Sequence, residues 1–110
     1  MSFIETIAKG LLRRSVIVHK EKMSESVYRI RIQGGRLKNV SYRPGYSIRV
    51  FGGRGKDTAR REKARSYSVW NFNRTDQTID IVVVTHSDGP EANWAKLCQP
   101  GDAVYFNFSV

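Results

Sequence analysis

Apolar and polar residues alternate with a period of two over most of this chain. Residues 26–33 show it most clearly, because Ile30 and Ile32 fall on one face while Arg29 and Arg31 fall on the other. This alternation is typical of half-buried strands, and Gly or Pro turn signals separate such segments. We therefore predict six strands. Five lie at residues 14–22, 26–33, 64–72, 78–86 and 103–108, and the remaining one follows the Pro44-Gly45 turn within residues 43–51 and ends at Phe51.

Two segments have the spacing of helices instead. Residues 2–14 place Ser2 three positions before Glu5, the capping-box spacing, and continue with apolar residues three and four apart. Residues 89–101 have Pro90 at a favourable first helical position and end in a Pro-Gly pair. We expect an N-terminal amphipathic helix and one short helix between the last two strands.

Six strands with short connections indicate a mainly β protein, an antiparallel barrel or a sandwich. With 110 residues the chain has the length of a single domain, spanning 1–110, and it contains no internal repeat. No apolar run approaches the length of about 20 residues needed to span a bilayer.

The charge of the chain is strongly asymmetric. Through Arg65 there are 17 Lys and Arg against 5 acidic residues, whereas the remainder carries 2 basic and 5 acidic residues, within a total of +9. This asymmetry indicates an anionic partner: a nucleic acid, a phosphorylated cofactor, an acidic protein or a membrane surface. A solubilising coat without a specific partner is the alternative.

Few residues are suited to catalysis. His19 is expected at the surface, and Cys98 as a small buried residue near a helix end. A single cysteine excludes an internal disulfide and a multi-cysteine metal site, and fits a reducing cytoplasm. We predict no catalytic residue and no metal ligand.

Two stretches could bind a ligand. In "RSYS", Arg65 and Tyr67 share one side of a strand and Ser68 takes the other, which suits a ligand with a phosphate and a flat ring. In "HSDGPEANWA", Gly89 precedes a helix N-terminus, where free backbone N–H groups favour an anion. An ordinary strand, and a capped helix anchored by Trp94, are the plain alternatives.

Together these stretches resemble a known family. The series "RSYSVWNF", "IDIVVVTHSDGPEANWA" and "QPGD" is similar to the FAD-binding domain of siderophore-interacting proteins, which belong to the ferredoxin–NADP reductase-like flavoproteins. The match is specific over residues 65–102. The resemblance implies a six-stranded antiparallel Greek-key barrel that holds FAD, with FMN the less favoured cofactor.

The resemblance also implies roles for individual residues. Arg65 would meet a flavin phosphate, Tyr67 would lie against the isoalloxazine, and Ser68 would hydrogen-bond near its redox-active edge. Backbone and ring atoms of the following loop would line the flavin, and the next helix start would hold the pyrophosphate. The residues implied there are Thr85, His86, Gly89, Pro90 and Asn93.

The sequence departs from the family pattern at two places in these motifs. Trp70 stands where the family has a second arginine, and Glu91 places a carboxylate beside the predicted anion site. Relatives continue into a nicotinamide-binding domain that this chain lacks, so we expect a flavin-dependent oxidoreductase domain that is incomplete alone. Reduced flavin would pass electrons to a ferric siderophore or another small acceptor.

Two other functions compete with this one. A basic oligonucleotide-binding barrel would use stacking aromatics, and a degenerate relative would be a cofactor-free interaction domain. The aromatic and basic residues for the first are Tyr28, Tyr42, Tyr46, Phe51, Arg29, Arg31, Arg43 and Arg49. We also expect a homo-oligomer, because the last strand, ending at the C-terminus, would leave an apolar edge open beside the Phe3, Ile7 and Leu11 stripe.

Overall fold

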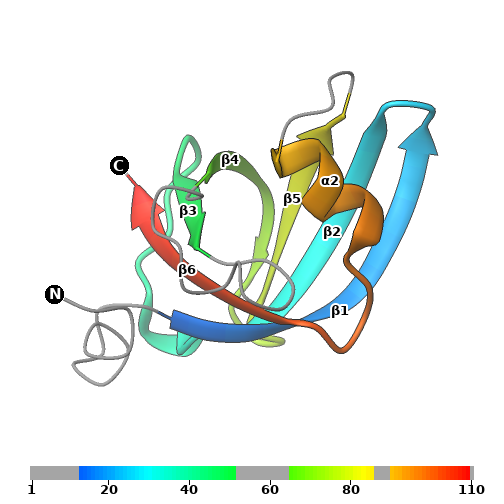
Figure 1. Ribbon diagram of the computed structural model, residues 1–110. Helices are drawn as coiled ribbons and strands as arrows, with labels where there is room; N and C mark the ends of the chain where they lie inside the picture. The colour runs from blue at the N-terminus through cyan, green and yellow to red at the C-terminus, as the bar shows by residue number, and fades with distance from the viewer. Residues whose placement is uncertain (1–12, 52–64, 86–89, 110) are drawn as a thin grey trace, which may run out of the picture.

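The structure, a computed structural model, describes residues 13–51, 65–85 and 90–109. These residues form six strands, one α-helix and one 3-10 turn (Figure 1). The elements are β1 (Arg13–Ser24), β2 (Val27–Gly34), η1 (Leu37–Asn39), β3 (Ser47–Phe51), β4 (Arg65–Asn73), β5 (Thr78–Val84), α2 (Pro90–Leu97) and β6 (Ala103–Ser109).

The strands close into an antiparallel barrel in the order β1-β2-β5-β4-β3-β6. All six predicted strands and the short helix before the last strand are confirmed. The predicted N-terminal helix lies outside the described residues up to residue 12, whereas Arg13 and Arg14 belong to β1. No helix in the described part of the chain is long and apolar enough to cross a membrane.

The open edge expected at the last strand is wrong. β6 pairs with β1 from Ala103↔Val16 to Phe106↔Arg13, and its other side pairs with β3. Because closure gives both sides of β6 a partner, the edge that motivated the oligomer prediction is absent here. Self-association itself stays a prediction.

The inner face of the barrel is filled mainly by branched aliphatic side chains. Cys98 contributes as a small buried residue with 2% exposure, as predicted, and His19 lies at the surface. The fully buried apolar residues are Ile17, Ile30, Ile32, Leu37, Ile48, Val50, Ile79, Ile81, Val83, Ala95, Cys98 and Phe106.

A bulge in β1 brings a lysine onto the inner side of the sheet. The register with β2 shifts between Ile17 and His19, so Lys20 pairs with Ile30. Its Nζ donates to the carbonyl oxygens of Lys96 at 3.0 Å and Cys98 at 2.8 Å. A cation at the C-terminal end of a helix satisfies free carbonyl groups and complements the helix dipole. Lys20 therefore anchors α2 to β1.

Candidate flavin site at the β4–β5 fork

The ladder between β4 and β5 stops partway along both strands. Within the described residues it ends at Val69↔Ile81. Beyond that pair, Arg65–Ser68 pair with β3 and Val82–Val84 pair with β2. Figure 1 shows β4 curving away from β5 at this point. We call this opening the β4–β5 fork, with Arg65–Ser68 and Val82–Val84 as its two arms.

Aromatic packing fills the inner side of the fork. The ring of Tyr67 stacks on that of Trp94 in α2, with centroids 5.9 Å apart and planes 25° from parallel. Both are buried, at 9% and 6% exposure. α2 follows the β5 arm in sequence and contacts the β4 arm through this pair, so the helix bridges the fork from within.

The outer side of the fork is exposed. Tyr67 and Val69 point into the barrel, and Ser68 between them faces out. Val84 on the opposite arm is 49% exposed. A hydroxyl and an apolar surface are therefore open to a ligand, and the alternation predicted for Tyr67 and Ser68 is confirmed.

Thr85 joins the end of β5 to the hairpin between β1 and β2. Its backbone N–H donates to the carbonyl of Ser26 at 2.6 Å, and its Oγ1 donates to the same oxygen at 3.1 Å. Thr85 is 6% exposed. These contacts fix the point where the chain leaves the β5 arm.

The remaining predicted site residues are placed less fully. Arg65 opens β4 opposite Val50, and Pro90 opens α2 as predicted, with Asn93 in the first turn of that helix. Side chains at these three positions are not described, and His86 and Gly89 lie outside the described residues. Their roles stay predictions.

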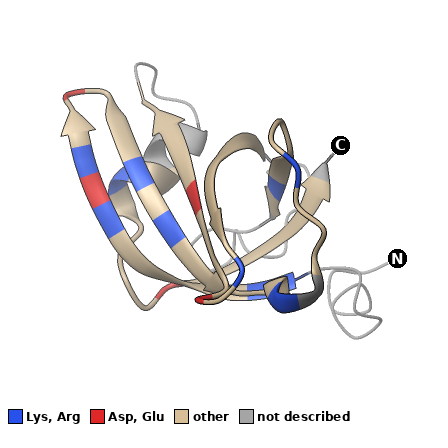
Figure 2. Cartoon of the chain, turned by 180° about the vertical axis from the view of Figure 1, so that it is seen from behind, with Lys and Arg blue, Asp and Glu red and all other residues tan. Residues whose placement is uncertain are grey.

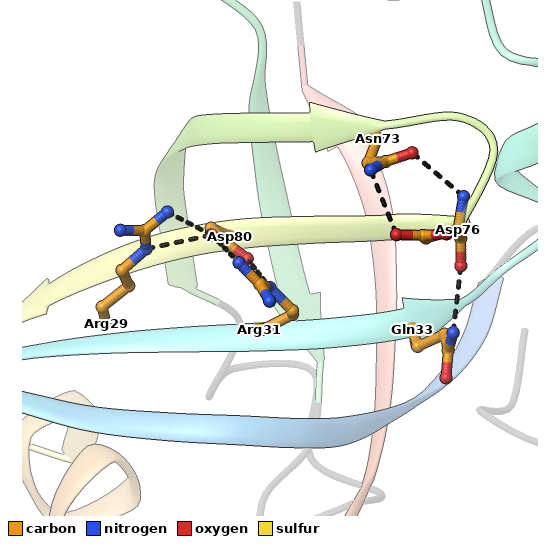
Figure 3. Close-up of polar contacts among 6 residues, drawn as sticks. All are labelled: Arg29, Arg31, Gln33, Asn73, Asp76 and Asp80. Atoms are coloured by element: carbon orange, nitrogen blue, oxygen red, sulfur yellow. Dashed lines mark hydrogen bonds and ion pairs between the residues drawn. The ribbon is translucent and has the colours of Figure 1, made fainter.

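A buried carboxylate on the outer face of β5 was missed by the sequence reading. Arg29 Nε donates to Asp80 at 2.9 Å and Arg31 Nε at 2.8 Å, while Asp80 is 1% exposed (Figure 3). Burial raises the pKa of Asp80, but the hydrogen bonds and charges of the two arginines outweigh it and hold the pKa below the ordinary value. The sequence feature that could have indicated these ion pairs was a single Asp within an otherwise apolar strand.

These contacts weaken the oligonucleotide-binding alternative. Lys and Arg gather on β1 and β2 (Figure 2), but Asp80 pairs with the two arginines of β2. The ring of Tyr42 stacks on Phe72 at 4.7 Å, with planes 2° from parallel, and Tyr46 packs edge-on against Tyr42. One face of the Tyr42 ring is therefore already covered by the protein.

The residues at the fork fit the flavin that the resemblance implies. A flavin ring needs a hydrogen-bond partner at its polar edge and apolar cover for its faces. Ser68 supplies an exposed hydroxyl on one arm, and Val84 is an exposed apolar residue on the other arm. The stacked rings of Tyr67 and Trp94 close the inner side of the opening.

Solved structures share this fold. A siderophore utilization protein from T. fusca superposes with a TM-score of 0.71 at 18% identity, covering 89% of this chain and 44% of that one. The siderophore-interacting protein from Acinetobacter baumannii gives 0.72 at 23% identity, covering 86% and 38%. A ferredoxin NADP+ reductase from Neisseria gonorrhoeae with bound FAD and NADP gives 0.72 at 19%, covering 90% and 38%.

This chain therefore spans less than half the length of each of these three proteins. Among curated proteins, no sequence matches it significantly. The profile of the siderophore-interacting FAD-binding domain matches residues 53–107, which is half of the chain and includes the whole β4–β5 fork. The chain belongs to the siderophore-interacting FAD-binding domain family.

Proposed function

We propose that this barrel holds FAD across the outer side of the β4–β5 fork and passes electrons from the reduced flavin to a ferric complex or another small acceptor. The observation that carries the proposal is the end of the β4–β5 ladder at Val69↔Ile81, inside the segment that the family profile matches. A bound flavin would supply the electron-transfer chemistry, and the chain would position it.

Different residues at and beside the fork would bind different parts of the cofactor. Ser68 would donate its hydroxyl to the polar edge of the ring, and the chain at Thr85 and His86 would line it. Arg65 would hold a phosphate. Gly89 and the first turn of α2, from Pro90 to Asn93, would receive the pyrophosphate at the positive end of the helix.

We also propose that the barrel has Greek-key connectivity, which the strand order supports. We assign pyridine-nucleotide oxidation to a separate nicotinamide-binding domain or protein. The Neisseria gonorrhoeae reductase, described with both FAD and NADP bound, is more than twice as long as this chain. We further propose that the barrel acts in the cytoplasm, where its buried Cys98 would stay a thiol.

Cofactor binding is tested by reconstitution. Protein incubated with excess FAD and desalted should keep a flavin absorption band, and calorimetry should give a Kd below about 100 μM. Ser68→Ala should weaken binding about fivefold through the lost hydrogen bond, whereas Ser41→Ala, at an exposed loop serine, should not. FMN titrated in parallel should bind more weakly than FAD. Colourless protein without measurable affinity for either flavin would refute the proposal.

Electron transfer is tested with holoprotein whose flavin is reduced anaerobically by one equivalent of dithionite. On mixing with a ferric chelate, the oxidised flavin spectrum should return as each ferric ion takes one electron. The gallium(III) complex of the same chelator is the control, because gallium(III) does not accept an electron under these conditions. Equal reoxidation with both complexes would contradict the choice of acceptor and leave FAD binding as a separate result.

A further inference from the structure

Trp70 exposes an aromatic ring beside the β4–β5 fork. It is 59% exposed, whereas Tyr67 and Trp94 nearby are 9% and 6% exposed. Indole rings in strands usually bury most of their area, because their apolar surface is large. Packing within the barrel does not account for the position of this ring.

A bulge turns Trp70 outward. The register of β4 on β5 passes from Val69↔Ile81 directly to Asn71↔Asp80, so Trp70 is the extra residue. Trp70 and Asn71 are consecutive and both exposed, which breaks the alternation of the strand. Bulges often redirect a side chain beside a binding site. This one directs an indole to the outer side of the barrel, next to the last pair before the fork.

Ser68 and Trp70 share that outer side. They are two residues apart on one strand, a separation of about 6.5 Å. Val84, 49% exposed, lies on the other arm of the fork. A fused three-ring system whose polar edge meets Ser68 is long enough to reach the indole. Tyr67 stacks on Trp94 on the inner side, so Trp70 is the outward aromatic ring among the described residues of β4.

We infer that Trp70 lies against one face of the bound flavin ring and is an aromatic binding residue of this site. The inference rests on the proposed function, since it needs a flavin at Ser68. It adds an aromatic contact at the position where the family pattern has its second arginine. Trp70 would supply apolar cover and a stacking surface where the outer side of the fork otherwise offers aliphatic and small polar groups.

The test uses the full chain reconstituted with FAD, comparing Trp70→Leu and Trp70→Phe with the unmodified protein. Trp70→Leu should weaken FAD binding about tenfold, and Trp70→Phe should stay within about threefold because it keeps a ring. An indole in contact with a flavin quenches flavin emission by electron transfer, so the emission of bound FAD should rise in both variants. Urea denaturation of the variants should show little change in the midpoint, because the ring is exposed.

Val18→Ala is the matched control. Val18 is the extra residue of the bulge in β1, is 39% exposed, and lies on a strand that does not border the fork. It should change neither FAD affinity nor flavin emission. If the unmodified chain binds FAD but both Trp70 variants keep its affinity and emission, this inference is wrong and the proposed function stands. If the unmodified chain does not bind FAD, both are refuted.

Discussion

Asp80 offers the sharpest test of how this barrel is stabilised. Its carboxylate is 1% exposed and accepts hydrogen bonds from Arg29 and Arg31, whose side chains are 31% and 40% exposed. Asp80→Asn keeps the shape but removes the charge. Removing one partner of a buried ion pair costs about 3–5 kcal/mol. Because water reaches both guanidinium groups, we reduce this to about 2 kcal/mol.

Urea denaturation followed by tryptophan emission measures this loss. With a slope of about 2 kcal/mol per M, the midpoint of Asp80→Asn should fall by about 1 M at neutral pH. Glu25→Gln is the control, since the Glu25 side chain is 98% exposed and its pair with Lys22 measures 3.8 Å. That variant should match the unmodified protein, because exposed ion pairs contribute little.

The pH dependence gives an independent check. The pKa of Asp80 lies below its ordinary value in the folded state, so the stabilisation is fully present above the unfolded pKa of about 3.9. It is lost as the pH falls through the folded pKa. The difference in stability between Asp80→Asn and the unmodified protein should therefore begin to shrink below about pH 4 and disappear as the pH falls through the folded pKa. A midpoint equal to that of Glu25→Gln at neutral pH, or a difference that persists in acid, would refute the reasoning.

Three further predictions concern the packing of the barrel and its self-association. Lys20→Met should destabilise the fold by about 1–2 kcal/mol in urea denaturation, because it frees two carbonyl oxygens at the end of α2; an equal loss in Lys22→Met, at an exposed lysine, would contradict this. Gly35→Ala should cost at least about 2 kcal/mol more than Gly45→Ala. Both residues have positive φ, but an added Cβ meets the Phe106 ring at 2.8 Å at the first and nothing within 4 Å at the second; equal midpoints would contradict the clash. We also propose that the chain self-associates more strongly at about 500 than 50 mM salt; light scattering that gives 12.6 kDa in both buffers would refute it.

The strands could be predicted because their information is local. Ile30 and Ile32 show the period of two in β2, and both are fully buried. The start of α2 could be predicted because the fixed φ of Pro90 suits a first helical position. These features depend on residues close together in sequence, so the sequence alone was sufficient to predict them.

The contacts that hold the site depend on pairing between distant segments. The bulge at Val18 shifts the faces of β1, so Lys20 falls on the side of Ile30 and reaches α2. A one-residue bulge leaves no clear mark in the alternation of so polar a strand. The partners of Asp80 likewise follow from β5 lying beside β2, which the order of the strands along the chain does not reveal.

The β4–β5 fork depends both on the local motif at the start of β4 and on the pairing of strands that are distant in sequence. A polar start to β4 would be costly in a strand covered on both faces. Here β3 holds the Arg65–Ser68 arm, β2 holds the Val82–Val84 arm, and the Tyr67–Trp94 pair fills the space within. Protein contacts therefore hold both arms in place, and such preorganisation reduces the cost of ordering the site when a ligand binds. It follows that loosening α2 should weaken FAD binding even where no residue that touches the flavin has changed.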